Sequence, residues 1–275
     1  MLRIAKQRIP LKWKFLAHQL SCTTTGRLAD LVLPPARKVV IVANARTGSN
    51  LLRSYLDHTP GVTAHGEIFG TYYTGDPFML AHIQHKGAVK HLEEMLRRRI
   101  SERVVCAKLL YRDFDENYRR IKNIPSMADL FDYLKSEKDI RIIHLRRENL
   151  LDVVLSMELA KRTGKFVGDH YNIGPVEIDP KYCHRQFEVI KASEELCRSA
   201  FQGPRCIEIT YQQLSSDTSA ALKKLQDFLN VGPINATSHY KKQNKDAPGV
   251  AISNYEELKA HFDGTPFERY FEEAS

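Results

Sequence analysis

The order of apolar and polar positions along the chain predicts buried strands that alternate with amphipathic helices. Short runs rich in Val and Ile are continuous rather than alternating, which is typical of strands buried on both faces of a parallel sheet. We expect four such strands, at residues 38–43 (KVVIVA), 103–109 (RVVCAKL), 140–145 (IRIIHL) and 205–209 (RCIEI). Helical periodicity covers residues 49–58, 87–99, 126–136, 149–163, 184–200 and 217–229. This rhythm predicts an α/β fold with right-handed crossovers.

The domain organisation follows from the length and from two prolines. A chain of 275 residues suffices for one large domain or two small ones, and its 43% hydrophobic and 27% charged residues are typical of a soluble globular protein. The alternating pattern starts after Pro34 and Pro35. We therefore expect a basic N-terminal extension at residues 1–33 and a single α/β domain at residues 34–275. Residues 164–181, rich in Gly and Pro, are a candidate substrate loop or lid.

The positive charge is concentrated in the N-terminal extension. The net charge is +8, and residues 1–29 hold six basic residues and no acidic one, which leaves a net +2 for the rest of the chain. With so small a net charge, the rest of the chain lacks the excess of positive charge that nucleic-acid binding requires. Lysines interleaved with Trp13, Leu16 and Leu20 are compatible with a peripheral membrane contact through residues 1–29, with a targeting segment, or with an extension packed on the domain. These alternatives stay open, as does a homodimer.

Cysteine and histidine spacing argues against metal and disulfide chemistry. Five cysteines without close pairs predict reduced thiols in a cytoplasmic protein, which would be membrane-peripheral if the extension binds lipid. The 11 histidines form no ligand motif at helical spacing, so we expect no metal.

The first chemical motif is the turn in KVVIVANARTGSNLLRSYL, where a strand passes directly into a helix. Gly48 would let the backbone approach an anion, the first N–H groups of the helix would point at it, and Arg46 would add a formal charge. The turn lacks the first glycine and the final GK[ST] of a Walker A loop, which disfavours a nucleotide kinase or GTPase. An ordinary strand-to-helix turn is the alternative.

The second motif is RIIHLRRENLLDVVLSMELA, which follows another buried strand. Arg146 and Arg147 lie where that strand ends, Asn149 is a natural N-cap, and Ser156 lies two turns into an apolar helix. The serine either faces a ligand or bonds back to the Asp152 carbonyl. Open α/β sheets bind ligands at the carboxyl ends of their strands, so a ligand with two anionic groups would satisfy both motifs.

The segments ARTGSNLL and HLRRENLLDVVLS resemble the 5′-phosphosulfate loop and the 3′-phosphate motif of sulfotransferases that use 3′-phosphoadenosine 5′-phosphosulfate (PAPS). RTGSNLL followed by HGE, and the late segment KKQNKDAPGVAISNYEELKAHFDGT, resemble the bacterial carbohydrate branch, which contains the trehalose and nodulation-factor enzymes. The resemblance implies a P-loop-NTPase-like central parallel sheet flanked by helices. It also implies sulfuryl transfer to a hydroxyl of a carbohydrate or glycolipid without a metal.

By this resemblance, the 5′-phosphosulfate is held by the first motif, at Arg46, Thr47, Gly48, Ser49 and Asn50. The 3′-phosphate is held by Ser156 with either Arg147 or Arg146, because the arginine-to-serine spacing does not separate the two arginines. The basic loop at Lys241, Lys242 and Lys245 would fold over the nucleotide, and is otherwise a solvated charged surface.

Two further residues are candidates for catalysis together with Arg46. Glu67 in AHGEIFG is the candidate general base, in a position similar to the carboxylate of the trehalose enzyme, and is otherwise a surface carboxylate or an arginine's ion-pair partner. Lys108 would bind sulfate or acceptor, and is otherwise a satisfied strand-end lysine.

Acceptor recognition is expected in loops around residues 70–86 and 164–181, at Tyr72, Tyr73, His82, Phe166, His170 and Tyr171. Two rival functions remain: an ATP- or GTP-dependent phosphotransferase with a degenerate P-loop, and a non-enzymatic membrane-surface adaptor that uses the basic extension.

Overall fold

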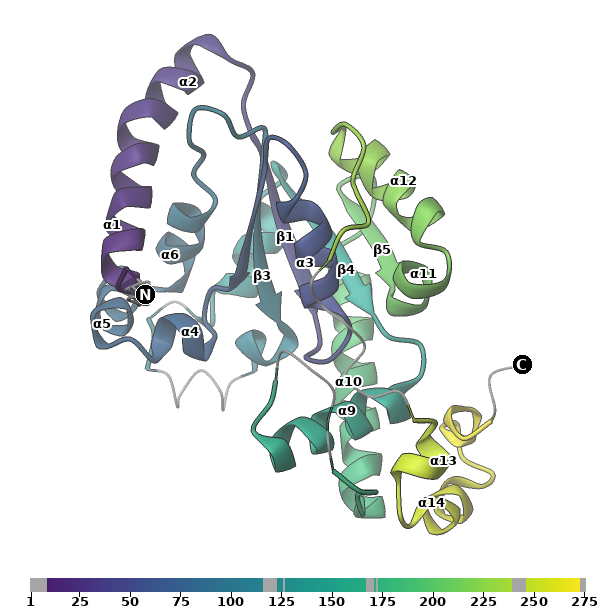
Figure 1. The fold of residues 1–275 in the computed structure, drawn as a ribbon. Coiled ribbons are helices and arrows are strands. Elements are labelled where there is room, and N and C mark those ends of the chain that lie inside the picture. The colour runs from purple at the N-terminus through teal and green to yellow at the C-terminus, as the bar shows by residue number, and fades with distance from the viewer. Residues whose placement is uncertain are drawn as a thin grey trace, which may run out of the picture. The chain divides into compact units, whose positions relative to one another are not determined.

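A central sheet organises the chain. The computed structural model describes residues 9–115, 123–125, 127–166, 171, 173–238 and 246–272 (Figure 1). The described strands form one sheet in the order β2-β3-β1-β4-β5. They are β1 (Arg37–Ala43), β2 (Val62–Glu67), β3 (Val104–Leu110), β4 (Ile140–Arg146) and β5 (Cys206–Thr210). β2 pairs parallel to β3 and β4 parallel to β5. The expected α/β fold, with a central parallel sheet and flanking helices, is confirmed.

β2 is the strand that the hydrophobic pattern did not predict. Its sequence VTAHGE is largely polar, and only Val62 and Ala64 are buried. β2 lies at the edge of the sheet beside β3, so it carries no continuous apolar run of the kind that marks a central parallel strand. The four predicted strands are each present within one residue of the expected bounds.

Helices connect and cover the strands. In chain order the described ones are α1 (Leu11–Ser21), the π-helical η1 (Cys22–Gly26), α2 (Arg27–Val32), α3 (Ser49–Asp57), α4 (Thr71–Thr74), α5 (Pro77–Lys86), α6 (Ala88–Met95), the 3-10 helix η2 (Tyr111–Phe114), α8 (Leu130–Ser136), α9 (Leu150–Thr163), α10 (Pro180–Ala200), α11 (Tyr211–Ser216), α12 (Thr218–Leu229), α13 (Pro248–Ala251), α14 (Tyr255–Phe262) and the 3-10 helix η3 (Glu268–Tyr270).

The expected start of α10 at residue 184 was wrong by one helical turn. The helix begins at Pro180, because Asp179 accepts a hydrogen bond from the Lys181 backbone N–H at 3.0 Å and proline is favoured in the first turn. The Gly- and Pro-rich connection after α9 is therefore shorter than the pattern indicated.

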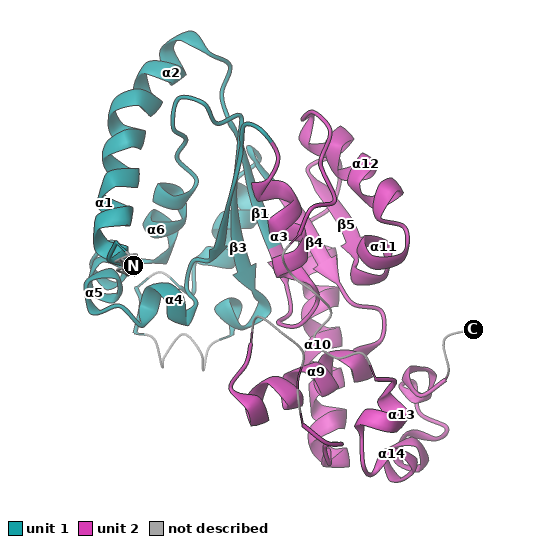
Figure 2. Ribbon diagram, in the orientation of Figure 1, with its two compact units in different colours: residues 1–41, 60–141 teal, residues 42–59, 142–275 magenta. Residues whose placement is uncertain are grey.

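The chain divides into two compact units, residues 1–41 with 60–141 and residues 42–59 with 142–275 (Figure 2). In unit 1 the described part of the basic extension is helical and buries Phe15, Cys22 and Ala29. A side chain at Gly26 would overlap the Arg98 carbonyl. Among the described residues, no helix combines the length and the apolar character that crossing a membrane requires. The expected boundary between residues 33 and 34 stays a prediction.

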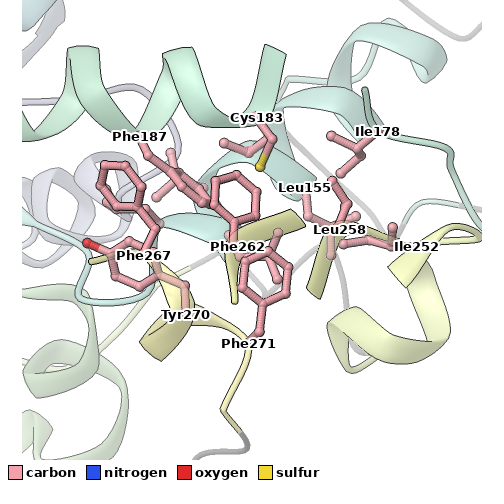
Figure 3. Close-up of a cluster of buried hydrophobic side chains, with 14 of the residues drawn as sticks. Leu155, Ile178, Cys183, Phe187, Ile252, Leu258, Phe262, Phe267, Tyr270 and Phe271 are labelled. Atoms are coloured by element: carbon pink, nitrogen blue, oxygen red, sulfur yellow. The ribbon is translucent and has the colours of Figure 1, made fainter. Parts of the chain in front are cut away.

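Unit 2 has a core that the C-terminal residues complete. Side chains of α9, α10, α13 and α14 form one buried cluster (Figure 3). Phe187, Leu258 and Phe262 are fully buried, and Phe262 stacks on Phe271 with ring centroids 5.2 Å apart. Buried side chains between Ala251 and Phe271 therefore belong to the core of this unit.

Candidate active site

The loop between β1 and α3 has the backbone shape of an anion cradle. Arg46 has φ 68° and Gly48 has φ 81°, and such left-handed residues in a tight turn make successive N–H groups converge. A Cβ at residue 48 would lie 2.5 Å from Cδ2 of Tyr211, so glycine also permits this close packing. α3 begins at Ser49, which places the N–H groups of its first turn and the positive end of the helix dipole at the same loop. Thr47 and Ser49 are buried in it.

The Arg46 side chain joins the two sequence motifs. Its Nε donates to Ser156 Oγ at 3.0 Å, its Nη1 to the Phe166 carbonyl at 2.6 Å, and its Nη2 to Tyr171 Oη at 2.8 Å. Ser156 therefore faces the loop, although it is 110 residues away in sequence. A bond from its hydroxyl back to the Asp152 carbonyl is not among the hydrogen bonds of the described residues.

Arg147 lies against the same loop. Its Nη2 donates to Asp152 Oδ2 at 2.7 Å, its guanidinium lies 4.6 Å from the Tyr211 ring centroid, and its Nη1 reaches the Arg46 carbonyl at 3.4 Å. Arg147 is 9% exposed, and within the described part of the chain its buried Nε has no hydrogen-bond partner. A buried guanidinium with an N–H available beside the β1–α3 loop is suited to donate a hydrogen bond to an anionic oxygen.

Arg146, by contrast, forms ion pairs with two carboxylates. Its Nη1 donates to Glu194 at 3.0 Å and its Nη2 to Glu208 at 2.8 Å. Burial alone would raise the pKa of Glu208, but hydrogen bonds from Arg198 and Arg146 lower it to about 2. The Nε of Arg146 is also buried without a partner among the described residues, yet the paired acids already balance its charge.

Glu67 and Lys108 form an ion pair in unit 1. Lys108 Nζ lies 3.1 Å from Glu67 Oε1, and Arg112 Nη2 lies 3.0 Å from Glu67 Oε2. The register of β2 and β3 places Glu67 opposite Lys108, which is 1% exposed. Burial raises the pKa of the nearby Asp113 to about 7. The ion-pair role weighed for Glu67 is thus present, and its role as a base stays a prediction.

Some expected residues lie elsewhere, and some contacts were missed. Lys241, Lys242, Lys245 and His170 lie outside the described residues. His82 pairs with Glu94 at 2.8 Å rather than standing free for an acceptor. Sequence reasoning missed Tyr211 and the pairing of Asp152 with Arg147. Tyr211 directly follows β5, and its position at a strand's carboxyl end was a usable signal.

Several known proteins are similar to the chain. Nodulation protein H of Rhizobium tropici is 26% identical over 254 residues, covering 87% of this chain and 95% of that protein. Nodulation protein H of Rhizobium meliloti is 22% identical over 258 residues, covering 88% and 98%. Among solved structures, a sulfotransferase from Alicyclobacillus acidocaldarius matches with a TM-score of 0.47 and 16% identity, covering 84% of this chain and 92% of that one. A mouse sulfotransferase complexed with 3′-phosphoadenosine 5′-phosphate (PAP) matches with a TM-score of 0.45 and 15% identity, covering 93% and 95%.

The family assignment rests on a family model. The model described as "Sulfotransferase family" matches residues 38–232, which is more than half of the chain. The match includes both motifs that meet at Arg46 and Ser156. The chain therefore belongs to the sulfotransferase family, whose members use PAPS, and is an enzyme of sulfuryl transfer.

Proposed function

We propose that the chain binds PAPS at the loop of residues 46–50 and transfers the sulfuryl group to a hydroxyl of a carbohydrate or glycolipid. The observation that carries the proposal is the network in unit 2 that joins Arg46, Ser156 and Arg147 around the N-terminus of α3. The spare buried N–H of Arg147 and the glycine-dependent turn fit a ligand with more than one anionic group.

Each residue of the network has a proposed role. The backbone N–H groups of residues 47–50, with Ser49 and Asn50, bind the 5′-phosphosulfate, and Arg46 stabilises the charge that develops there. Arg147 and Ser156 bind the 3′-phosphate. Arg147 is preferred to Arg146 because two carboxylates already hold Arg146. Lys241, Lys242 and Lys245 are proposed to close over the nucleotide. PAPS supplies the sulfuryl group, and its loose in-line transfer needs positioned cations more than covalent chemistry.

Calorimetric titration with PAP, the product nucleotide, tests the donor site. Without magnesium, we expect PAP to bind more tightly than AMP or ATP, because AMP and ATP lack the 3′-phosphate. Arg46→Ala should weaken PAP binding by about tenfold or more, since a charge-assisted hydrogen bond contributes roughly 1.5–3 kcal/mol. Arg162→Ala removes an exposed arginine that donates to the Glu177 carbonyl, and is the matched control. A preference for magnesium with ATP would instead support the phosphotransferase.

Glu67 is proposed to accept the proton of the acceptor hydroxyl. Lys108 is proposed to hold the carboxylate in place and to contact the sulfate or the acceptor. Glu67→Gln keeps the side-chain shape and removes the basic oxygen, so we expect turnover to fall by about 10²–10⁴-fold while PAP affinity is kept. Near-full turnover of this variant with intact PAP binding would exclude Glu67 as the base. Glu93→Gln, which changes a half-buried carboxylate of α6 paired with Lys90, is the control.

The acceptor proposal rests on the resemblance to the bacterial carbohydrate branch and on the two nodulation proteins among the relatives. A panel of oligosaccharides, glycolipids and phenols, assayed for PAP release from PAPS, distinguishes the acceptor classes. We expect turnover with the sugars and the glycolipids. Turnover confined to the phenols would contradict the carbohydrate assignment.

Exposed apolar residues on α1 and α2 support a peripheral membrane contact. The exposed large apolar side chains of residues 9–33, which hold both helices, are Ile9, Trp13, Leu16, Leu20, Leu28, Leu31, Val32 and Leu33. Basic residues Lys12, Lys14 and Arg27 accompany them, and the one acid, Asp30, is paired with Arg98 at 3.0 Å. Apolar and basic side chains without free acids suit an anionic lipid surface. We propose that this segment docks on such a surface.

Vesicle sedimentation tests the docking. We expect binding to phosphatidylglycerol vesicles that high salt weakens, and little binding to phosphatidylcholine vesicles. A Trp13→Ser, Leu16→Ser, Leu20→Ser variant should lose it, whereas Leu196→Ser, an exposed apolar residue of α10, should not. Self-association of the parent that the triple variant loses, without vesicle binding, would mark this surface as a homodimer contact and contradict the proposal.

A further inference from the structure

Two histidines and a glutamate of unit 1 gather where α5 and α6 meet. His82 lies on α5, and His91 and Glu94 lie one turn apart on α6. One ligand atom from each of the three residues lies within 4.8 Å of the other two. His82 Nε2 is 2.8 Å from Glu94 Oε2. None of these residues has a place in the sulfuryl-transfer network described above.

His91 is an unusual buried residue. It is 0% exposed, and among the described residues neither of its ring nitrogens makes a hydrogen bond of acceptable geometry. Within the described part of the chain its two buried ring nitrogens therefore lack partners, which is costly in a protein interior.

The surroundings of His91 match a metal centre. Imidazole nitrogens with one carboxylate oxygen are the donor set typical of zinc sites, where ligand bonds are about 2.0–2.2 Å long. The rings of Phe15, Phe69 and Tyr73 lie around His91, with centroids 6.3, 5.6 and 6.2 Å from it, and an apolar shell of this kind excludes solvent. Lys86 Nζ, 3.8 Å from Glu94 Oε1, is an opposing charge, but its side chain is 43% exposed and can turn to solvent.

We propose that His82, His91 and Glu94 bind one divalent transition-metal ion, with zinc as the best match, and that the ion ties α5 to α6. The sequence pattern led us to expect no metal, because two ligands on α6 and a third nine residues before them match no ligand motif that we recognised. The proposal assigns the ion a structural role and is independent of the PAPS site.

Metal titration of the full chain tests the site. Tag-free protein, stripped with a chelator, is titrated with Zn²⁺ by calorimetry and with Co²⁺ by visible absorption, which reports the coordination geometry. We expect one equivalent of either metal and a higher unfolding temperature with Zn²⁺, because an ion that binds only the folded state stabilises it. His91→Gln and Glu94→Gln should each weaken binding by more than about tenfold.

The controls separate this site from incidental binding. His85→Gln removes an exposed histidine three residues from His82 on the same helix, and should bind Zn²⁺ like the parent. If His91→Gln does not fold, Glu94→Gln decides the test, because its amide oxygen can still pair with His82. The proposal is overturned if the parent binds no stoichiometric metal, or if Glu94→Gln binds it as tightly as the parent.

Discussion

At the residue scale, the environment of each arginine determines what it can bind. Arg46, Arg146 and Arg147 have the same side chain, yet Arg46 donates to neutral oxygens, Arg146 to two carboxylates, and Arg147 to one carboxylate while covering the Tyr211 ring. A guanidinium held by two carboxylates has little attraction left for a phosphate, whereas Arg147 is offset by a single carboxylate and keeps a buried Nε–H that can donate to one.

Substitution of Arg147 and Arg146 distinguishes their roles. We expect Arg147→Ala to weaken PAP binding by about tenfold to a hundredfold, since a hydrogen bond to a charged group contributes roughly 1.5–3 kcal/mol. AMP binding should change little, so the preference for PAP over AMP should collapse in this variant. Calorimetry with both nucleotides measures the preference.

Arg146→Ala is the matched comparison and should keep the preference for PAP. It should instead lower the unfolding temperature, because Glu194 is left buried without its cation. If Arg146→Ala loses the PAP preference while Arg147→Ala keeps it, the assignment of the two arginines is reversed.

At the element scale, a turn and a helix cap position the residues of the candidate site, and helices distant in sequence pack against the helix that carries them. The β1–α3 turn needs its two left-handed residues, and Asn149 caps α9 by accepting a hydrogen bond from the Asp152 backbone N–H at 3.2 Å. That cap fixes the start of the helix carrying both Asp152 and Ser156. α9 in turn packs in the cluster that α10, α13 and α14 complete (Figure 3).

Removing one buried ring from α14 should destabilise this cluster. We expect Phe262→Ala to lower the free energy of unfolding by about 3–5 kcal/mol, because a fully buried phenylalanine leaves a cavity. Urea denaturation measures the change. His261→Ala, the exposed neighbouring position, should change stability by about 0.5 kcal/mol or less. Equal effects of the two substitutions would show that α14 contributes no core packing in solution.

At the scale of the whole molecule, two carboxyl groups give stability opposite pH dependences. Hydrogen bonds from Arg198 and Arg146 overcome burial and hold the pKa of Glu208 at about 2, below its ordinary value of 4.5. Its stabilisation is therefore present above about pH 4.5 and is lost as the pH falls toward 2. Burial raises the pKa of Asp113 from 3.8 to about 7. Its contribution is complete below about pH 3.8 and is lost as the pH rises through 7.

Thermal unfolding measured across this pH range tests the direction of both pH dependences. We expect the stability difference between the parent and Glu208→Gln to shrink as the pH falls from 4.5 to 2. Relative to Asp113→Asn, the parent should lose stability as the pH rises from about 4 to 7. Differences that stay constant with pH would show that neither carboxyl group is perturbed in the folded protein.

The fold class, four strands and the two motifs follow from the amino-acid sequence alone, because these depend on interactions between near neighbours. The apolar run before Asn44 predicts a buried strand, Gly48 predicts a turn whose backbone can approach an anion, and Asn149 predicts a helix cap, all without tertiary information. The family resemblance, carried by those motifs, gave the expected enzyme class, which the family model confirmed.

Which of these residues contact one another depends on tertiary packing. Nothing local shows that Arg46 bonds to Ser156, that two distant glutamates hold Arg146, or that Tyr211 packs against Gly48. The edge strand β2 escaped prediction because it carries no continuous apolar run. The cluster around His91 escaped it because the ligand atoms meet only when α5 packs against α6.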